Sequence, residues 1–192
     1  IIEKTNSLNP DVVVITGDFV DGSGKLSIKT FEQLNNIKAP TFMVMGNHEF
    51  YEGEQRVIDL LSETKVKVLR NESELIKGIN IIGLDYSENK SYVAEHLKNI
   101  EFNNSKPTIL LNHVPMGYED AAKSGVKLQL SGHTHNGQIF PFTLLVKARF
   151  PKINGLYNID NLSLYVSPGT GTWGPPMRLG SKNEITVLKL KK

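Results

Sequence analysis

The sequence predicts a single α/β domain in which helices flank a β-sheet. The chain has 192 residues, of which 39% are hydrophobic and 22% are charged, as is typical of one globular domain with a core. Short apolar, β-branched runs alternate with segments of helical spacing over the first two thirds, and this alternation favours strands covered by helices. The last third is richer in strand-like runs. We therefore assign residues 1–192 to one domain.

Strands are expected where an apolar run is short, rich in β-branched residues and bounded by turn residues. The first such run, "VVVIT", is continuous and predicts a strand that is buried on both faces. In chain order, the expected strands are 12–16, 41–45, 66–70, 75–77, 79–84, 108–112, 127–131, 162–167 and 184–190.

Helices are expected where apolar residues recur at intervals of three and four. This spacing predicts helices over 25–37, 53–64 and 91–100. The run "IFPFTLLV" (139–146) has two interpretations, a lipid-facing lip or a core strand or crossover, and we favour the second. The stretch 167–181 is rich in Pro and Gly and predicts a long loop that is either functional or mobile.

Composition excludes several functions. The net charge is only +2 and the basic residues are scattered, so no nucleic acid partner is expected. The chain has no cysteine, which excludes disulfides and thiolate metal sites. No apolar run approaches the roughly 18 residues that a membrane span needs.

Polar side chains follow four of the expected strands, at the point where each strand ends. The segments after these strands read "GDFVDG", "GNHEF", "HVP" and "GHTH". Ligands of open α/β sheets bind beyond the carboxyl ends of the strands. We therefore expect one group of side chains at one edge of one sheet: Asp18, Asn47, His48, His113, His133 and His135.

This group has the chemistry of a metal site. His133 and His135 are two residues apart, and in an extended segment such residues point to the same side. Oxygen and nitrogen ligands without sulfur suit Mn²⁺, Fe or Zn²⁺ rather than a calcium site. Asn47 would ligate without adding charge, so the site would stay cationic and attract a phosphate ester.

Each of these residues also has a purely structural interpretation. Asp18 and Asn47 follow glycines and could be turn residues, and His113 could be a hydrogen-bonded core histidine. Asp21 is better explained as a turn residue, or as a group that contacts a metal ligand, than as a ligand itself. Asp85 could line the cleft, but a turn role explains it better.

The four blocks, in this order, resemble the signature blocks of the calcineurin-like metallophosphoesterases over about residues 10–135. The remainder is similar to a bacterial branch with membrane-anchored or exported members, described as UDP-2,3-diacylglucosamine hydrolase-like. The resemblance implies a four-layer sandwich of two mixed β-sheets flanked by helices. It also implies two divalent metal ions, with Mn²⁺ expected and Fe or Zn²⁺ as alternatives, which activate a hydroxide that hydrolyses a phosphate ester.

Roles are carried over residue by residue from the family pattern. Asp18 would bridge the two metals. Asn47, His113 and His133 would complete one metal, and His135 would ligate the other. His48 would assist the leaving group without binding metal, and Glu49 would orient His48.

One block of the family pattern, an Asp-x-His ahead of Asp18, is absent, because no histidine precedes Asp18. We therefore expect an N-terminally truncated domain that lacks its first strand, holds only one complete metal site and is weakly active. Localisation stays open between the cytoplasm and a membrane-associated or extracytoplasmic place. Membrane contact would come from a missing N-terminal segment or a lipid substrate.

The expected substrate is a small phosphodiester, pyrophosphate or phosphomonoester, nucleotide-linked or lipid-linked. Arg178 and Trp173 lie in the long loop, where the arginine could bind substrate phosphate and the tryptophan could pack on a sugar, base or acyl chain. Loop anchoring is an equally good explanation for both. The competing functions are a nuclease, which lacks its basic groove here, and a non-catalytic metal-binding domain, in which His48 would have no use.

Overall fold

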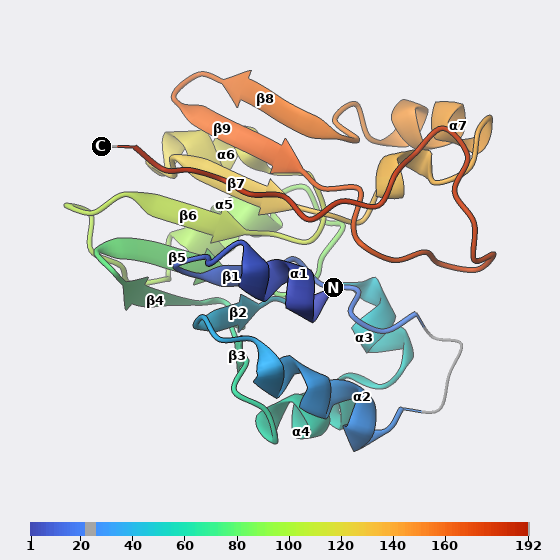
Figure 1. Cartoon of the computed structure of the whole chain (residues 1–192). Coiled ribbons are helices and arrows are strands. Elements are labelled where there is room, and N and C mark those ends of the chain that lie inside the picture. The colour runs from blue at the N-terminus through green and yellow to red at the C-terminus, as the bar shows by residue number, and fades with distance from the viewer. Residues whose placement is uncertain (22–25, 192) are drawn as a thin grey trace.

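A computed structural model describes residues 1–21 and 26–191; residues 22–25 and 192 lie outside the described part. It shows a mixed α/β fold with two sheets flanked by helices (Figure 1). The expected start of the first predicted helix, Lys25, falls outside the described residues. The chain begins with a short helix, α1 (Ile2–Ser7), ahead of the first strand.

The smaller sheet contains β1 (Val13–Ile15), β2 (Thr41–Met43) and β3 (Lys67–Val68), in that order. The pairs β1–β2 and β2–β3 are parallel, so this sheet is parallel where we expected a mixed one. The expected strand over 12–16 is half-buried rather than buried on both faces, because β1 is an edge strand of the described sheet.

Three helical elements cover the outer face of the smaller sheet, namely α2 (Ile28–Glu32), η1 (Gln33–Asn36) and α4 (Glu54–Ser62). Phe31, Val57 and Leu61 from these helices pack on Met43 and neighbouring residues. The first expected helix thus divides into α2 and a 3-10 turn, whereas the second is confirmed as α4.

The larger sheet has six strands in the order β4-β5-β6-β7-β9-β8. Their bounds are β4 (Glu72–Ile76), β5 (Ile79–Gly83), β6 (Thr108–Leu111), β7 (Leu128–Ser131), β8 (Gly155–Ile159) and β9 (Leu162–Val166). The central pairs are parallel, whereas β4–β5 and β8–β9 are antiparallel hairpins. Helices α5 (Tyr92–Leu97) and α6 (Tyr118–Lys123) pack on its outer face.

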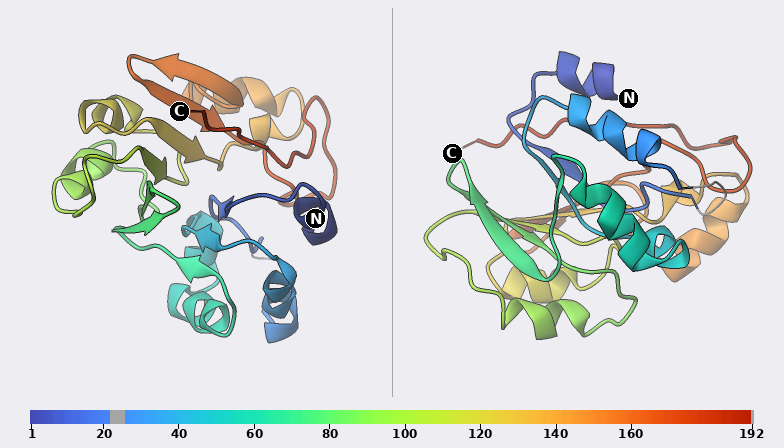
Figure 2. Two further views of the ribbon diagram at one scale, coloured as in Figure 1. Left: turned by 60° about the vertical axis from the view of Figure 1, so that its left-hand side comes forward. Right: turned by 90° about the horizontal axis from the view of Figure 1, so that it is seen from below.

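The two sheets face one another across a shared core. Phe42, Val44 and Leu69 from the smaller sheet and its strand ends pack against Leu111 and Leu130 of the larger sheet. Figure 2 shows the two sheets between α2 and α4 on one side and α5 and α6 on the other. This order gives the four layers expected from the resemblance.

Two sequence predictions about the last third are wrong. Residues 184–190 are not a strand: their one backbone ladder contact is Glu184 N to Gly169 O, and Val187, Leu188 and Leu190 are exposed. A strand needs a continuous partner to satisfy its backbone groups, and this segment pairs with none of the described strands. The run 139–146 is not a core strand either, because it leads into helix α7 (Phe142–Arg149), none of whose residues is buried.

Among the described residues, no helix has the length and apolar character needed to cross a membrane.

Candidate metal centre

The candidate site lies where parallel strands of both sheets end. Asp18 follows β1, and Asn47 and His48 open the short helix α3 (Asn47–Tyr51) after β2. His113 follows β6, while His133 and His135 follow β7, at the start of the 3-10 turn η2 (His135–Gly137). The prediction of one sheet edge is therefore wrong in one respect, because the site is shared by two facing sheets.

Four ligand atoms converge. The Nε2 atom of His113 lies 3.2 Å from Asp18 Oδ2, 3.2 Å from Asn47 Oδ1 and 3.1 Å from His133 Nδ1. His133 Nδ1 lies 2.9 Å from Asn47 Oδ1. Asp18, His113 and His133 also form the group of acidic and imidazole side chains with ligand atoms close enough to hold one ion. Ligand atoms that bind one ion with bonds of roughly 2.0–2.2 Å lie about 3 Å from one another, which is the spacing found here.

The hydrogen bonds around His113 support a cation at this point. Its Nδ1 atom lies 2.6 Å from the carbonyl oxygen of Thr16, so Nδ1 carries a proton and donates it. In the neutral ring, Nε2 then presents a lone pair toward Asp18, Asn47 and His133, whose facing atoms include two oxygens. Lone pairs that face each other at this distance repel unless a proton or a cation lies among them. The residues present fit a divalent ion.

In the metal-free cluster, charge coupling favours an ionised Asp18 and raises the pKa of His113 against the effect of its burial, while His133 and His135 are kept neutral. Burial would raise the pKa of Asp18, but the hydrogen bond and charge of His113 outweigh it and lower the pKa to about 2. Burial lowers the pKa of His133 and of His135 to about 4 in each case. At neutral pH, Asp18 is therefore a carboxylate and His133 and His135 are neutral, which are the forms that bind metal.

Close backbone contacts hold Asp18 in place. Gly17 has a φ of +89°, and a Cβ atom there would lie 2.6 Å from Gly46 N and 2.7 Å from His113 Nδ1. Asp18 itself has a φ of +54°, and both His133 and His135 have positive φ values of 68° and 50°. Non-glycine residues rarely adopt this conformation, and its concentration here indicates a site held under local strain.

Glu49 is a positioning residue for the Asp18 loop. Its fully buried carboxylate accepts hydrogen bonds from the backbone N–H groups of Asp18 (2.9 Å), Phe19 (2.7 Å), Val20 (3.2 Å) and Gly46 (2.7 Å). We expected Glu49 to orient His48, but these contacts show that its acceptor atoms serve the loop backbone instead.

Replacing Glu49 with glutamine should destabilise the fold. The amide would turn an N–H group toward backbone donors that need an acceptor, which we expect to cost about 2–4 kcal/mol of unfolding free energy. Urea unfolding of Glu49→Gln measures this cost, with the exposed Glu32→Gln as the matched control. Equal stability of the two variants would contradict the assigned role.

His48 lies beside the cluster and outside it. Its backbone N–H donates to Asp18 Oδ1 at 3.1 Å, and its ring packs edge-on against Tyr51 with centroids 5.6 Å apart. The Nδ1 atom is buried without a hydrogen-bond partner among the described residues, and the same holds for Nδ1 of His135. Both rings line a small hollow together with Asp18, Asp21 and Trp173.

Arg178 anchors the long loop. Its five N–H groups donate to backbone oxygens of His135, Pro168 and Gly171 and to the Ser181 hydroxyl, at 2.6–3.1 Å. The guanidinium thus has no N–H left for a substrate phosphate in this structure. These contacts support loop anchoring by Arg178 rather than the expected contact with a substrate phosphate.

Sequence reasoning missed Gln138, whose buried side chain holds the tryptophan over the hollow. Its Oε1 atom accepts from Trp173 N at 3.0 Å, and its Nε2 atom donates to Trp173 O at 2.8 Å. Its place three residues after His135 is the one signal in the sequence that could have indicated a role.

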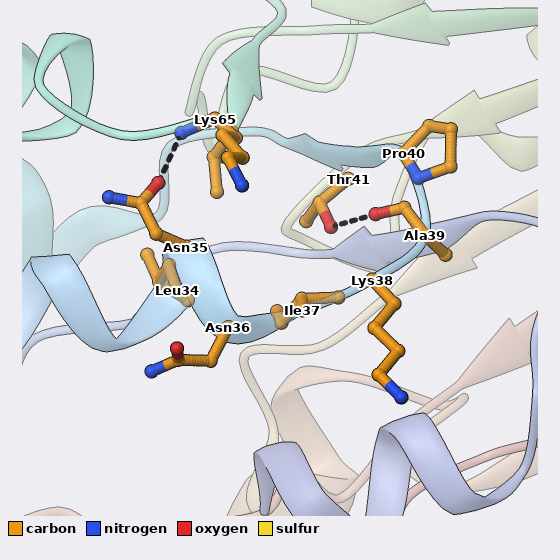
Figure 3. A pocket seen from close by; sticks show the side chains of 10 residues that line it. Leu34, Asn35, Asn36, Ile37, Lys38, Ala39, Pro40, Thr41 and Lys65 are labelled. Carbon is orange, nitrogen blue, oxygen red and sulfur yellow. Dashed lines mark hydrogen bonds between the residues drawn. The ribbon is translucent and has the colours of Figure 1, made fainter.

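A wider hollow, of about 380 Å³, lies elsewhere, lined by residues that include Leu34, Lys38 and Lys65 (Figure 3). It sits at the amino end of β2, away from the histidines, and contains no group of acidic or imidazole side chains. We place the functional site at the smaller hollow because the ligand atoms converge there.

Comparisons with known proteins agree with this geometry. Residues 1–137 match the sequence profile of the calcineurin-like phosphoesterases. A metallophosphoesterase of Campylobacter jejuni is 40% identical over 199 residues, which cover 100% of this chain and 53% of that protein. A transmembrane protein with a metallophosphoesterase domain from Bos taurus is 35% identical, covering 99% of this chain and 48% of that protein. The chain spans about half the length of the curated relatives it matches.

Solved structures share the fold at low identity. The sulfate thiohydrolase SoxB of Thermus thermophilus superposes with a TM-score of 0.56 at 15% identity, covering 85% of this chain and 35% of the other. A 5'-nucleotidase precursor from Thermus thermophilus gives 0.52 at 15% identity, covering 88% and 41%. Together with the matched profile and the relatives above 30% identity, these findings show that the chain belongs to the calcineurin-like phosphoesterase family.

Proposed function

We propose that this domain hydrolyses a small phosphate ester with the help of divalent metal ions. The observation that carries the proposal is the convergence of Asp18, Asn47, His113 and His133, with His48 beside them. When bound, the ions supply positive charge for the phosphate oxygens and lower the pKa of a water molecule. A purely metal-binding domain would not need a free imidazole in the same hollow.

The side chains of the cluster would serve two metal positions. Asp18, Asn47, His113 and His133 would hold one ion, and the Thr16 carbonyl fixes the His113 ring so that its Nε2 atom is turned toward the other three side chains. His135, whose Nδ1 atom is buried without a partner among the described residues, would hold a second ion together with Asp18. The other ligands of this second position would be the Asp-x-His pair of the family pattern, and no histidine precedes Asp18 in this chain.

His48 serves the leaving group. Its ring lines the hollow together with Asp18 and His135, so a phosphate bound at the cluster would place an ester oxygen within reach. From there the imidazole donates a hydrogen bond or a proton to that oxygen as the ester bond breaks. His48 is therefore the catalytic residue, while Glu49 acts through the Asp18 loop.

The substrate is proposed as a small phosphorylated molecule. Two structural neighbours bear the names 5'-nucleotidase and NAD nucleotidase, which supports a nucleotide or nucleotide-linked ester as the first class to test. Relatives named as transmembrane proteins with this domain support a location near a membrane and a lipid-linked ester as the second class. We propose Mn²⁺ as the first metal to test.

Hydrolysis of chromogenic esters tests the function directly. An aryl phosphodiester and an aryl phosphomonoester are compared with added Mn²⁺, with a chelator as the control. We expect Mn²⁺-dependent release of the aryl alcohol from at least one of them. Metal binding without turnover of either ester would favour the non-catalytic alternative.

Stability of the metal-free chain should fall as the pH falls from about 6.5 to about 4. His133 and His135 have pKa values near 4 when folded, against 6.5 when exposed, so the unfolded state binds more protons in this window. Each group contributes a slope of at most about 1.4 kcal/mol per pH unit. His113 acts in the opposite direction: burial would lower its pKa, but Asp18 raises it, so its contribution to stability is present at low pH.

Urea unfolding near pH 7 and near pH 5, with a chelator present, measures this dependence. A free energy of unfolding that is unchanged or larger near pH 5 would contradict the assigned burial of His133 and His135.

A further inference from the structure

An apolar surface borders the candidate site. Figure 1 shows α7 and the segment after β9 together, beyond the carboxyl ends of β7 and β9. Large hydrophobic side chains on these two segments are exposed, from 42% at Trp173 to 65% at Leu145. We call this surface the apolar lip; its residues are Phe140, Phe142, Leu144, Leu145, Trp173, Met177 and Leu179.

The two segments form one piece. Phe140 N donates to Leu179 O at 2.8 Å, and Leu179 N donates to Gln138 O at 2.9 Å. The Gln138 side chain binds both backbone groups of Trp173. The lip is therefore built onto the η2 turn that carries His135, and it is held there by backbone as well as side-chain contacts.

Helix α7 turns its smaller side chains toward the protein and leaves its large apolar side chains exposed. Val146 contacts the small core cluster that includes Phe150, and Thr143 packs beneath Gly137. Phe142 and Leu145, which are three residues apart and share one helix face, remain exposed. A helix that shows its large apolar side chains to solvent beside a functional site indicates an interaction surface.

The two segments that form the lip carry basic residues and no acidic ones, whereas the acidic residues near the lip include Glu88, which pairs with Arg149, and Asp18 and Asp21, which line the hollow beside Trp173. Residues 138–153 contain Lys147, Arg149 and Lys152 and no acidic residue, and residues 167–182 contain Arg178 and Lys182 and no acidic residue. Arg149 binds Glu88, whereas Lys147 and Lys182 form no ion pair with a described residue. Apolar and aromatic side chains beside unpaired lysines are the composition of a surface that sits in an anionic bilayer interface.

We infer that the apolar lip docks on an anionic lipid bilayer, with Phe142 and Leu145 inserted among the acyl chains and Lys147 near the headgroups. Trp173 belongs to both the lip and the hollow that holds His48 and His135. A docked domain would thus open its site toward the membrane surface and favour phosphate esters carried by lipids. This last consequence rests on the proposed hydrolase function, whereas docking itself does not.

Vesicle binding tests the inference. The chain is sedimented with vesicles of phosphatidylcholine alone and with vesicles that also contain phosphatidylglycerol. Trp173, the single tryptophan of the chain, reports insertion through its fluorescence. We expect binding to the anionic vesicles, a shift of emission to shorter wavelength, and weaker binding at high salt.

A double variant, Phe142→Gln with Leu145→Gln, should lower partitioning to anionic vesicles by roughly tenfold or more, because two inserted side chains are lost. Leu156→Gln on β8 is the matched control, since Leu156 is 60% exposed and lies outside the lip. Far-ultraviolet circular dichroism and thermal unfolding verify that both variants keep the fold.

Absence of binding to anionic vesicles, or an equal loss in Leu156→Gln, would overturn the inference. A dimer that dissociates in the double variant and does not bind vesicles would also overturn it, because a second copy would then cover the lip. None of these assays contains substrate, so their failure is distinct from a failure to hydrolyse the chromogenic esters.

Discussion

Replacing Asp18 with asparagine should lower turnover of the responsive chromogenic ester by at least roughly a hundredfold. Loss of a residue that merely orients a metal ligand costs about 10–100-fold, and Asp18 is a ligand itself. The variant keeps the size of the side chain and an acceptor for the His48 N–H, but it loses the charge that faces His113 Nε2 at 3.2 Å. Steady-state kinetics with Mn²⁺ measure the effect.

Asp85→Asn provides the matched control. Asp85 also follows a strand, but it binds the exposed side chain of Arg70 rather than the histidines. We expect this control to retain turnover within a few-fold, because the Asp85 carboxylate binds Arg70 and does not belong to the converging ligand atoms. If Asp18→Asn kept full turnover, the bridging role proposed for this carboxylate would be wrong.

Replacing His48 with alanine should lower kcat by about 10²–10⁴-fold and leave the metal content unchanged. The imidazole is proposed to act on the leaving group, and general acid catalysis contributes about this factor. The hydrogen bond between His48 and Asp18 is made by the backbone N–H, and the Nδ1 atom of the ring has no hydrogen-bond partner among the described residues. Steady-state kinetics and metal analysis of the same sample test both parts.

Varying the pKa of the leaving alcohol distinguishes a catalytic role of His48 from a structural one. The defect of His48→Ala should shrink for aryl alcohols of low pKa, which need less help to depart. His96→Ala is the control, because His96 stacks on Tyr92 on α5, outside the site. Loss of bound metal in His48→Ala would refute the role, as would a defect that does not vary with the leaving group.

The ligand cluster could be predicted because it follows from topology. Parallel strands bring their carboxyl ends to the same edge of a sheet, so the order of apolar runs and polar ends places Asp18 beside Asn47, and His113 beside His133. The division into two sheets could not be predicted from these runs. A buried run has the same composition in either sheet, and only the family resemblance implied two.

The residues that support the site escaped prediction for a different reason. Glu49 binds the backbone of residues 18–20, about 30 positions away, and Arg178 binds the carbonyl of His135, 43 positions away. Such contacts depend on tertiary approach and leave no local pattern. The helix α7 was missed because its apolar residues face outward, so the run 139–146 has the composition of a core segment without being one.

Metal content tests the central claim most directly. The chain, His133→Ala and His96→Ala are loaded with Mn²⁺, desalted and analysed by plasma mass spectrometry. We predict at least one ion per chain in the unchanged protein and in His96→Ala, and loss of that ion in His133→Ala. Equal metal content in His133→Ala, or no bound ion in the unchanged protein, would contradict a metal centre at Asp18, Asn47, His113 and His133.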